Sequence, residues 1–228
     1  MKEKYAQFLL KKTIKDYNLI AKEFSRTREN VWPEMNFLFS DFLKEKDKVL
    51  DLGCGNGRWF EIFQKHKIHY VGIDGSEELI KIAKEKYPQG TFKVSDALNL
   101  PFQDNDFEKV YSIAVFHQIP SKNFRLQFLK EVKRVLKPGG FLILTVWRFN
   151  HKKTLLSLIK YTILKLLGKT DLDFGDVLYA RTKRYYHVFS KRELISLVRK
   201  SGLEIQKIGI VKNQKGNRQN IYLIAKNS

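Results

Sequence analysis

Three glycines at alternate positions, within the stretch VLDLGCGNGRWF at residues 49–60, constrain the fold of this chain more than any other feature. The apolar run before the glycines is typical of a buried strand, and RWFEIFQKH after them has the spacing of a helix. A glycine-rich turn from a strand into a helix is where open α/β sheets bind ligands. The sequence therefore predicts a ligand site at this turn.

Strand and helix patterns alternate from about residue 48 to residue 147, which predicts a parallel sheet with helices on both faces. Ser76 and Ser121 stand where N-caps should open two of the helices, and residues 137–140 are predicted to form a turn. Two β-rich runs, LEIQKIGIV and NIYLIAK, flank NQKGNRQ and predict an antiparallel hairpin that completes the sheet.

We interpret the 228 residues as one domain with four parts. These are an N-terminal helical cap, the ligand-binding core, an inserted segment on the substrate side, and a C-terminal helix with the hairpin, at residues 1–46, 47–150, 151–188 and 189–228.

Cysteine usage and hydropathy limit the class of protein. The single cysteine excludes an internal disulfide, and no Cys/His cluster predicts a metal site. Lysines interrupt each apolar run near the N-terminus, unlike in a signal peptide, and no run of apolar residues is long enough for a spanning helix. We expect a cytoplasmic protein.

Charge is concentrated in the last third of the chain. The sequence has 43 Lys plus Arg against 24 Asp plus Glu, and residues 151–228 alone have 17 basic and five acidic residues. A localised basic surface suits a polyanionic partner such as RNA. The alternative is a generally lysine-rich composition that says nothing about partners.

Carboxylates around the glycine turn indicate what kind of ligand it binds. The glycines Gly53, Gly55 and Gly57 do not have the G-x-G-x-x-G spacing that cradles a pyrophosphate, and Asp51 before them would repel one. A cationic ligand without phosphate would instead be attracted. Asp74, about twenty residues further on, ends the next predicted strand, where a carboxylate can accept from both hydroxyls of a ribose.

A third carboxylate, Asp96, ends the third predicted strand and can accept from an adenine amine. Each of these acids alone could equally be a helix cap or a solvated side chain. Three of them in register with one glycine loop indicate a single ligand.

VLDLGCGNG, GIDGS, VSDALNLPFQDNDFEKV and VLKPGG resemble the successive motifs of class I S-adenosylmethionine-dependent methyltransferases, across residues 47–147. The resemblance implies a Rossmann-like fold with a mostly parallel seven-stranded sheet, and S-adenosyl-L-methionine as the cofactor. It further implies cofactor contacts for the following residues: Asp51, Gly53, Gly55 and Asn56 for the methionine part, Asp74 for the ribose, and Asp96 with Ala97 for the adenine.

The flanking sequences resemble a narrower family. YNLIAKEFSRTRENVWP, SIAVFHQIPSKNFRLQFLKEV and DVLYARTKRYYHVFSKREL are similar to enzymes that methyl-esterify 5-carboxymethyluridine at the tRNA wobble position, including the methyltransferase part of the AlkB-type tRNA enzyme. The resemblance implies tRNA as substrate and a small zinc-binding activator protein as a partner. The chain departs from the family at Gln118, where members usually have a second histidine, and in its lysine-rich insertion.

Catalytic roles are predicted for Arg28 and His117. The family resemblance implies that Arg28 holds the carboxylate of either the cofactor or the substrate, since a guanidinium binds carboxylates through two hydrogen bonds, and we favour the cofactor. A carboxylate nucleophile is ionised at neutral pH and needs no general base, so His117 is expected to position or donate rather than accept a proton. His117 could instead have a purely structural role.

Substrate contacts are predicted for Trp32, Arg184, Tyr186 and His187, since charge and aromatic surface suit an unpaired base with its phosphates. At least one tyrosine of this segment is expected to pack in the core instead.

Residues 154–167 are apolar and basic, so they could contact a membrane surface, cover the substrate side of the sheet, or shield an edge for a partner. Two alternative functions remain open: a small-molecule or quinone methyltransferase at a membrane surface, and a non-enzymatic RNA-binding partner.

Overall fold

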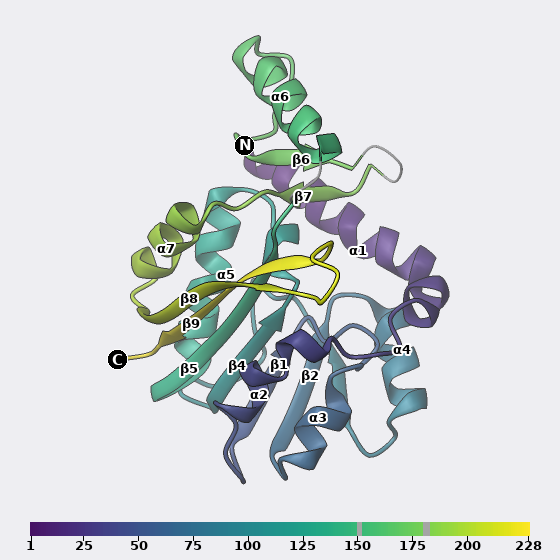
Figure 1. The fold of residues 1–228 in the computed structure, drawn as a ribbon, viewed down its shortest axis with the longest axis vertical. Helices are drawn as coiled ribbons and strands as arrows, with labels where there is room; N and C mark the ends of the chain where they lie inside the picture. The colour runs from purple at the N-terminus through teal and green to yellow at the C-terminus, as the bar shows by residue number, and fades with distance from the viewer. Residues whose placement is uncertain (150–151, 180–182) are drawn as a thin grey trace.

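The computed structural model describes residues 1–149, 152–179 and 183–228. Within these residues the main sheet has seven strands, in the order β3-β2-β1-β4-β5-β9-β8 (Figure 1). The strands are β1 (Lys48–Leu52), β2 (His69–Asp74), β3 (Thr91–Val94), β4 (Phe107–Ile113), β5 (Leu136–Trp147), β8 (Glu204–Lys212) and β9 (Gln219–Lys226).

The first five strands of this sheet pair in parallel, and β9 pairs antiparallel with both β5 and β8. The predicted mostly parallel sheet and the predicted C-terminal hairpin are therefore both confirmed. Because β1 to β4 run in one direction, the loops that follow them all emerge at the same edge of the sheet.

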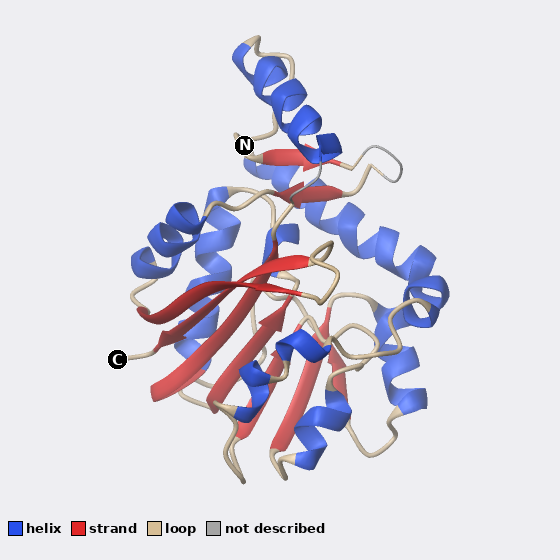
Figure 2. Cartoon of the chain, viewed as in Figure 1, coloured by secondary structure: helices blue, strands red, loops and turns tan. Residues whose placement is uncertain are grey.

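Helices cover both faces of the sheet (Figure 2). Side chains of α5 and α7 pack in the hydrophobic core of one face, and side chains of α2, α3 and α4 pack in the core of the other. The long helix α1 packs against α4. The helices are α1 (Glu3–Arg26), η1 (Pro33–Met35), α2 (Phe37–Ser40), α3 (Phe60–Lys65), α4 (Glu77–Lys86), η2 (Phe116–Gln118), α5 (Lys122–Val135), α6 (Lys152–Leu166) and α7 (Lys191–Lys200).

The predicted N-caps are confirmed. The Ser76 hydroxyl accepts a hydrogen bond from the Leu79 amide at 3.2 Å, and the Ser121 hydroxyl accepts one from the Phe124 amide at 3.2 Å. These contacts satisfy amides that have no partner within the first turn of a helix, so they fix where α4 and α5 begin.

The turn predicted at residues 137–140 was wrong, because these residues lie inside β5. Leu136 is fully buried and pairs with Phe107 on β4. The next pair is Lys109 with Phe141, so the register of the two strands shifts between these pairs. Gly139 absorbs the irregularity with a φ of +78°. The buried Leu136 anchors the start of the strand, so the chain bulges here rather than turning.

The inserted segment contains α6 and a two-stranded antiparallel sheet of β6 (Asp176–Leu178) and β7 (Tyr185–His187), which the sequence did not predict. Helix α6 projects away from the main sheet (Figure 1). Leu155, Leu156, Ile159, Ile163 and Leu166 are exposed on it. No helix among the described residues is long and apolar enough to cross a membrane. The predicted start of the insertion, at residues 150–151, lies outside the described residues.

Candidate functional site

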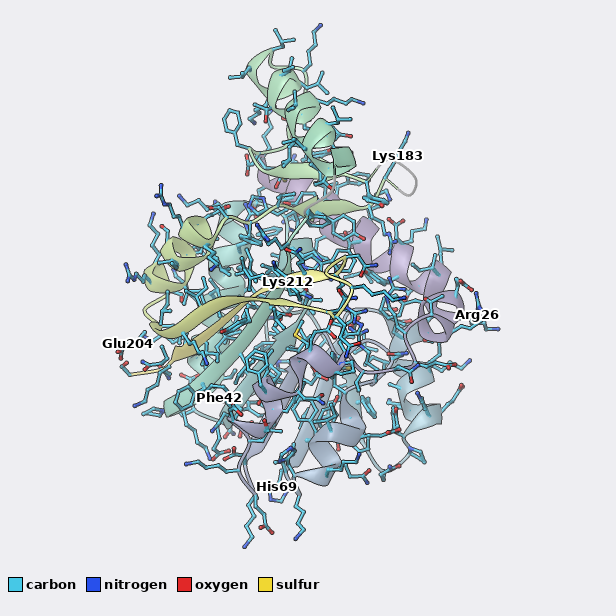
Figure 3. All side chains as sticks on the ribbon, in the orientation of Figure 1. Arg26, Phe42, His69, Lys183, Glu204 and Lys212 are labelled. Atoms are coloured by element: carbon cyan, nitrogen blue, oxygen red, sulfur yellow. The ribbon has the colours of Figure 1, made fainter. Side chains whose placement is uncertain are left out.

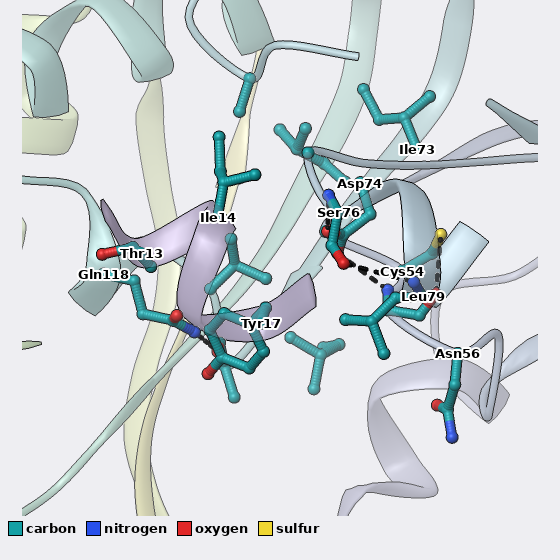
Figure 4. A pocket seen from close by; sticks show the side chains of 18 of the residues that line it. Thr13, Ile14, Tyr17, Cys54, Asn56, Ile73, Asp74, Ser76, Leu79 and Gln118 are labelled. Atoms are coloured by element: carbon teal, nitrogen blue, oxygen red, sulfur yellow. Dashed lines mark hydrogen bonds between the residues drawn. The ribbon is translucent and has the colours of Figure 1, made fainter. Parts of the chain in front are cut away.

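A pocket lies at the edge of the sheet where β1 to β4 end, and α1 covers it (Figure 4). It encloses about 1080 Å³ of space, including its opening to solvent. Its wall includes residues 53–56 after β1, residues 74–76 after β2, residues 95–97 after β3 and residues 113–115 after β4. The structure thus brings together one loop from each of four parallel strands.

Glycine is required in the loop after β1 for steric reasons. Gly53 has a φ of +83°, and a Cβ atom on it would lie 2.3 Å from the Cγ2 atom of Val115. Any side chain would therefore strain the backbone and clash with the loop after β4. Gly55, with a φ of +57°, donates its amide to the Asp74 carboxylate at 3.0 Å.

Asp74 and Asp96 both lie on the pocket wall, and the cofactor contacts predicted for them stay predictions. The second Asp74 oxygen accepts from the Ser76 amide at 2.9 Å, and one Asp96 oxygen accepts from the Leu98 amide at 2.8 Å. Burial raises the pKa of Asp74, although the backbone amides of Ser76 and Gly55 oppose this shift. Ala97 lies beside Asp96 on the same wall.

Asp51 lies behind the loop rather than on the pocket wall. Its carboxylate is 1% exposed and accepts a hydrogen bond from the Tyr70 hydroxyl at 3.0 Å. Burial raises the pKa of Asp51 to about 7, because the hydrogen bond from Tyr70 only partly offsets the loss of water. The contact predicted between Asp51 and the cofactor stays a prediction.

Arg28, Trp32 and Asn56 also line the pocket. The Asn56 amide donates to the Arg28 carbonyl at 3.5 Å, and so links the glycine loop to the segment that follows α1. The Arg28 guanidinium donates to the Thr27 hydroxyl at 2.8 Å and lies 4.5 Å from the centre of the Phe24 ring. Arg28 is half-buried and part of the pocket wall.

His117 is fully buried behind the pocket wall. Its ring stacks on Trp147 at 4.7 Å and on Tyr186 at 5.7 Å, and neither ring nitrogen has a hydrogen-bond partner among the described residues. Burial lowers the pKa of His117 to about 3, so the imidazole is neutral at physiological pH. Trp147, not His117, contributes to the pocket wall.

The other three predicted substrate residues lie on or beside β7. Tyr186 is buried against Trp147, with ring centres 5.4 Å apart. The Arg184 guanidinium lies 5.5 Å from the centre of the Tyr17 ring. His187 is 1% exposed, and its two ring nitrogens lie 2.7 Å from an Asp176 oxygen and 2.8 Å from a Glu193 oxygen. The structure therefore brings Arg184 and Tyr186 near the pocket and gives His187 carboxylate partners of its own.

The residues of the pocket wall that the prediction from sequence missed include Tyr17, Arg58, Gln118 and Trp147. Tyr17 forms a hydrogen bond with Gln118 across the pocket (Figure 4). Arg58 directly follows the glycine loop and Trp147 ends a predicted strand, and these positions could have identified them. Nothing in the helical pattern of α1 distinguished Tyr17.

Comparison with known proteins agrees with this geometry. A family described as "Methyltransferase domain" matches residues 50–144. The tRNA (carboxymethyluridine(34)-5-O)-methyltransferase of Schizosaccharomyces pombe is 30% identical over 224 residues, which cover 92% of this chain and 93% of that protein. The enzyme of the same name from Arabidopsis thaliana is 38% identical over 146 residues, but this alignment spans only 35% of its length.

Two solved structures have the same fold. A SAM-dependent methyltransferase from Methanosarcina mazei aligns with a TM-score of 0.72 at 26% identity, over 86% of this chain and 98% of that one. A putative methyltransferase from Haloferax volcanii, solved in complex with the Trm112 methyltransferase activator, aligns with a TM-score of 0.69 at 17% identity, over 94% and 96% of the two chains.

The order of the strands, the pocket at their carboxyl ends and the nearly full-length match to the S. pombe protein lead to one conclusion. The chain belongs to the S-adenosylmethionine-dependent methyltransferases, in the family that contains the tRNA carboxymethyluridine methyltransferases.

Proposed function

We propose that this protein transfers a methyl group from S-adenosylmethionine to the carboxymethyl group of wobble uridine in tRNA. The observation that carries the proposal is the composition of the pocket wall, where strand-end carboxylates accompany arginines. The carboxylates suit the hydroxyl and amine donors of an adenosyl group, and the arginines suit carboxylates. Cofactor and substrate each carry a carboxylate.

The residues of the pocket fit the cofactor. Asp74 would accept from the ribose hydroxyls, and Asp96 with Ala97 would hold the adenine, while Gly53 and Gly55 leave room for close approach of the methionine part. The bound cofactor supplies an electrophilic methyl group on a sulfonium. The protein contributes alignment of the nucleophile and exclusion of water.

The proposed substrate needs no proton acceptor, because a carboxylate is already ionised at neutral pH. This requirement agrees with a buried His117 whose pKa is about 3 and which remains neutral. We propose that His117 positions Trp147, on which it stacks at 4.7 Å, and that Arg28 directly binds a carboxylate.

Exposed basic side chains and aromatic side chains at the pocket support an RNA substrate. Lys183 and Lys212 are exposed and carry no acidic partner among the described residues, and Lys183 lies at the outer rim of the molecule (Figure 3). Trp147 on the pocket wall and Tyr186 behind it form an aromatic surface suited to an unstacked base. We propose a cytoplasmic location, which is the expectation from the sequence.

We further propose that a small zinc-binding activator protein binds this chain. The support is the family resemblance together with the fold shared with the Haloferax volcanii methyltransferase, which was solved with its activator. Co-purification of the chain with a candidate activator on a size-exclusion column tests this part.

The reaction is tested with bulk tRNA that has been treated with mild base, which hydrolyses existing esters to free carboxymethyl groups. Incubation with cofactor labelled in the methyl group, followed by digestion to nucleosides, should place the label in a base-labile ester of uridine. The reaction should be run with and without the candidate activator. Untreated tRNA provides the control, and it should accept less label.

Label recovered in a lipid extract, with none in tRNA under either condition, would overturn the proposal. That result would support the alternative of a small-molecule or quinone methyltransferase at a membrane surface. We do not favour this alternative, because the relative that matches nearly the whole chain is a tRNA enzyme.

A further inference from the structure

The pocket wall contains a buried cation without an anion. Arg58 directly follows the last glycine of the loop and is only 8% exposed. Its Nη1 atom has no hydrogen-bond partner among the described residues, and none of the ion pairs formed by those residues includes Arg58. The buried Asp51 carboxylate attracts the Arg58 charge without forming an ion pair with it, and Asp51 already accepts a hydrogen bond from Tyr70. A buried guanidinium without a partner is costly, because it loses hydration and gains no hydrogen bond in return.

Aromatic rings form the surroundings of this guanidinium. Its central carbon lies 4.2 Å from the centre of the Trp32 ring and 5.0 Å from that of Trp59, and the two rings meet edge to face. The rings stabilise the positive charge but accept no strong hydrogen bond. Burial and the nearby positive charge of Arg28 lower the pKa of Arg58 to about 10, although the negative charge of Asp51 opposes the shift. Arg58 therefore remains charged at neutral pH.

A second arginine on the same ring shows the contrast. The Arg218 guanidinium lies 4.7 Å from the Trp32 ring centre, but its Nε and Nη2 atoms donate to the Glu34 carboxylate at 2.7 and 3.1 Å. Trp32 thus contacts one arginine that forms an ion pair with a carboxylate and one that forms no ion pair among the described residues. The second of these, Arg58, is the one that lines the pocket.

We infer that Arg58 is a carboxylate-binding residue of this pocket, with Trp32 and Trp59 holding its guanidinium in place. The inference rests on the proposed function, in which two carboxylates enter one pocket. The carboxylate that Arg58 binds has two sources: the amino-acid part of the cofactor, or the carboxymethyl group on the RNA. Arg28 is then available for the other one.

Calorimetric titration distinguishes the cofactor as the source. S-adenosylhomocysteine contains the carboxylate, whereas 5′-methylthioadenosine lacks the whole amino-acid part. If the cofactor is the source, Arg58→Met should weaken S-adenosylhomocysteine binding by about tenfold to a hundredfold, the loss expected for a charge-assisted hydrogen bond, and should change methylthioadenosine binding little. Arg58→Lys should bind S-adenosylhomocysteine more tightly than Arg58→Met does but more weakly than wild type, because lysine keeps the positive charge but cannot donate two parallel hydrogen bonds to one carboxylate.

Fluorescence anisotropy distinguishes the RNA as the source. The probes are an anticodon stem-loop with 5-carboxymethyluridine and the same stem-loop with its uncharged methyl ester. If the RNA is the source, wild type should prefer the acid, and Arg58→Met should reduce that preference about tenfold. A wild-type protein that does not distinguish acid from ester would contradict the proposed substrate, while the titration with S-adenosylhomocysteine would still test Arg58.

The double variant Glu34→Gln with Arg218→Met is the matched control. It removes the arginine that shares the Trp32 ring and leaves the net charge unchanged, so both binding measurements should stay within about threefold of wild type. Arg58→Met should also melt no lower than wild type without ligand, because it removes an unpaired buried charge and keeps the apolar stem.

Unchanged binding in both measurements would overturn the inference. So would a large drop in the melting temperature of ligand-free Arg58→Met, or an equal loss of methylthioadenosine binding, since either would show that Arg58 only supports the structure.

Discussion

Polar side chains are used differently in the pocket loops and in the inserted segment. At the ends of β2 and β3, the carboxylates of Asp74 and Asp96 accept from nearby backbone amides and still line a cavity. In the insertion, the buried carboxylate of Asp176 is surrounded by side chains: the Tyr185 hydroxyl donates to it at 2.6 Å, His187 lies at 2.7 Å and Arg125 at 3.7 Å. The first arrangement leaves groups available to a ligand, and the second uses them to fasten β6 and β7 onto α5 and α7.

The comparison explains why His187 is a poor candidate for substrate contact compared with Tyr186, its neighbour in β7. Side chains alternate along a strand, so His187 faces the Asp176 cluster while Tyr186 faces Trp147. The cluster fixes this register. We therefore expect His187 to position Tyr186 through β7.

Removing Asp176 should have the largest effect on stability. Asp176→Ala leaves Arg125 buried without a counter-charge, and should lower the free energy of unfolding by about 3–5 kcal/mol. Urea denaturation measures this loss. Asp104→Ala is the control, because Asp104 is exposed and its ion pair with Arg134 should contribute less than about 1 kcal/mol. Equal losses in the two variants would show that the cluster is not what fastens the insertion.

Titration of Asp51 should lower the free energy of unfolding of the protein as the pH rises. Its folded pKa of about 7 exceeds the ordinary value of 3.8, so the protonated form is favoured by folding. This contribution is complete below about pH 4 and is lost as the pH rises to about 7, at no more than about 1.4 kcal/mol per pH unit. Unfolding of Asp51→Asn, measured from pH 5 to pH 7, should show a weaker decline than wild type. Parallel curves would contradict the assignment.

Asp74→Ala should weaken binding of the cofactor. It removes the acceptor for the Gly55 and Ser76 amides on the pocket wall, and should weaken S-adenosylhomocysteine binding by about 1–3 kcal/mol in a calorimetric titration. Glu77→Ala, at an exposed position on α4, should bind as wild type does. Unchanged affinity in Asp74→Ala would mean that the ribose lies elsewhere.

His117, between the two regions, should show a pH dependence opposite to that of Asp51. Its folded pKa of about 3 is below the ordinary 6.5, so its contribution to stability is present above pH 6.5 and is lost as the pH falls towards 3. His117→Phe keeps an aromatic ring in the stack and should be less destabilised than wild type between pH 6.5 and pH 5.5, by about 1 kcal/mol. Thermal melts at both pH values measure the difference, and an identical loss in the variant would exclude His117 as its source.

The smallest effect is expected on the outer face of α6. Leu156 and Ile163 are 66% and 51% exposed, so Leu156→Lys and Ile163→Lys should each change the free energy of unfolding by no more than about 0.5 kcal/mol. A loss well above 1 kcal/mol would show that this face is covered in solution, which an analytical ultracentrifugation run would detect as self-association.

The site residues that follow directly from local patterns were predictable, and the rest were not. Asp74, Asp96 and the glycines follow strands that their own apolar runs identify, so the fold delivers them to one edge. Arg58 is equally close to the loop in sequence, but its importance rests on having no partner, and this becomes visible only when Trp32 and Trp59 are placed around it. The turn expected at residues 137–140 is instead part of β5, because the strand already begins at the buried Leu136, which pairs with Phe107.

The sequence by itself determined the order of strands and helices, the caps that begin α4 and α5, and the glycine turn, because periodicity, capping and positive φ act over a few residues. Only the tertiary structure decided which polar groups remain available. Asp51 accepts a hydrogen bond from Tyr70, His187 is hydrogen-bonded to Asp176, and the Nη1 atom of Arg58 has no hydrogen-bond partner among the described residues. These outcomes depend on how the chain packs, and the partners of a buried group determine its charge and its role.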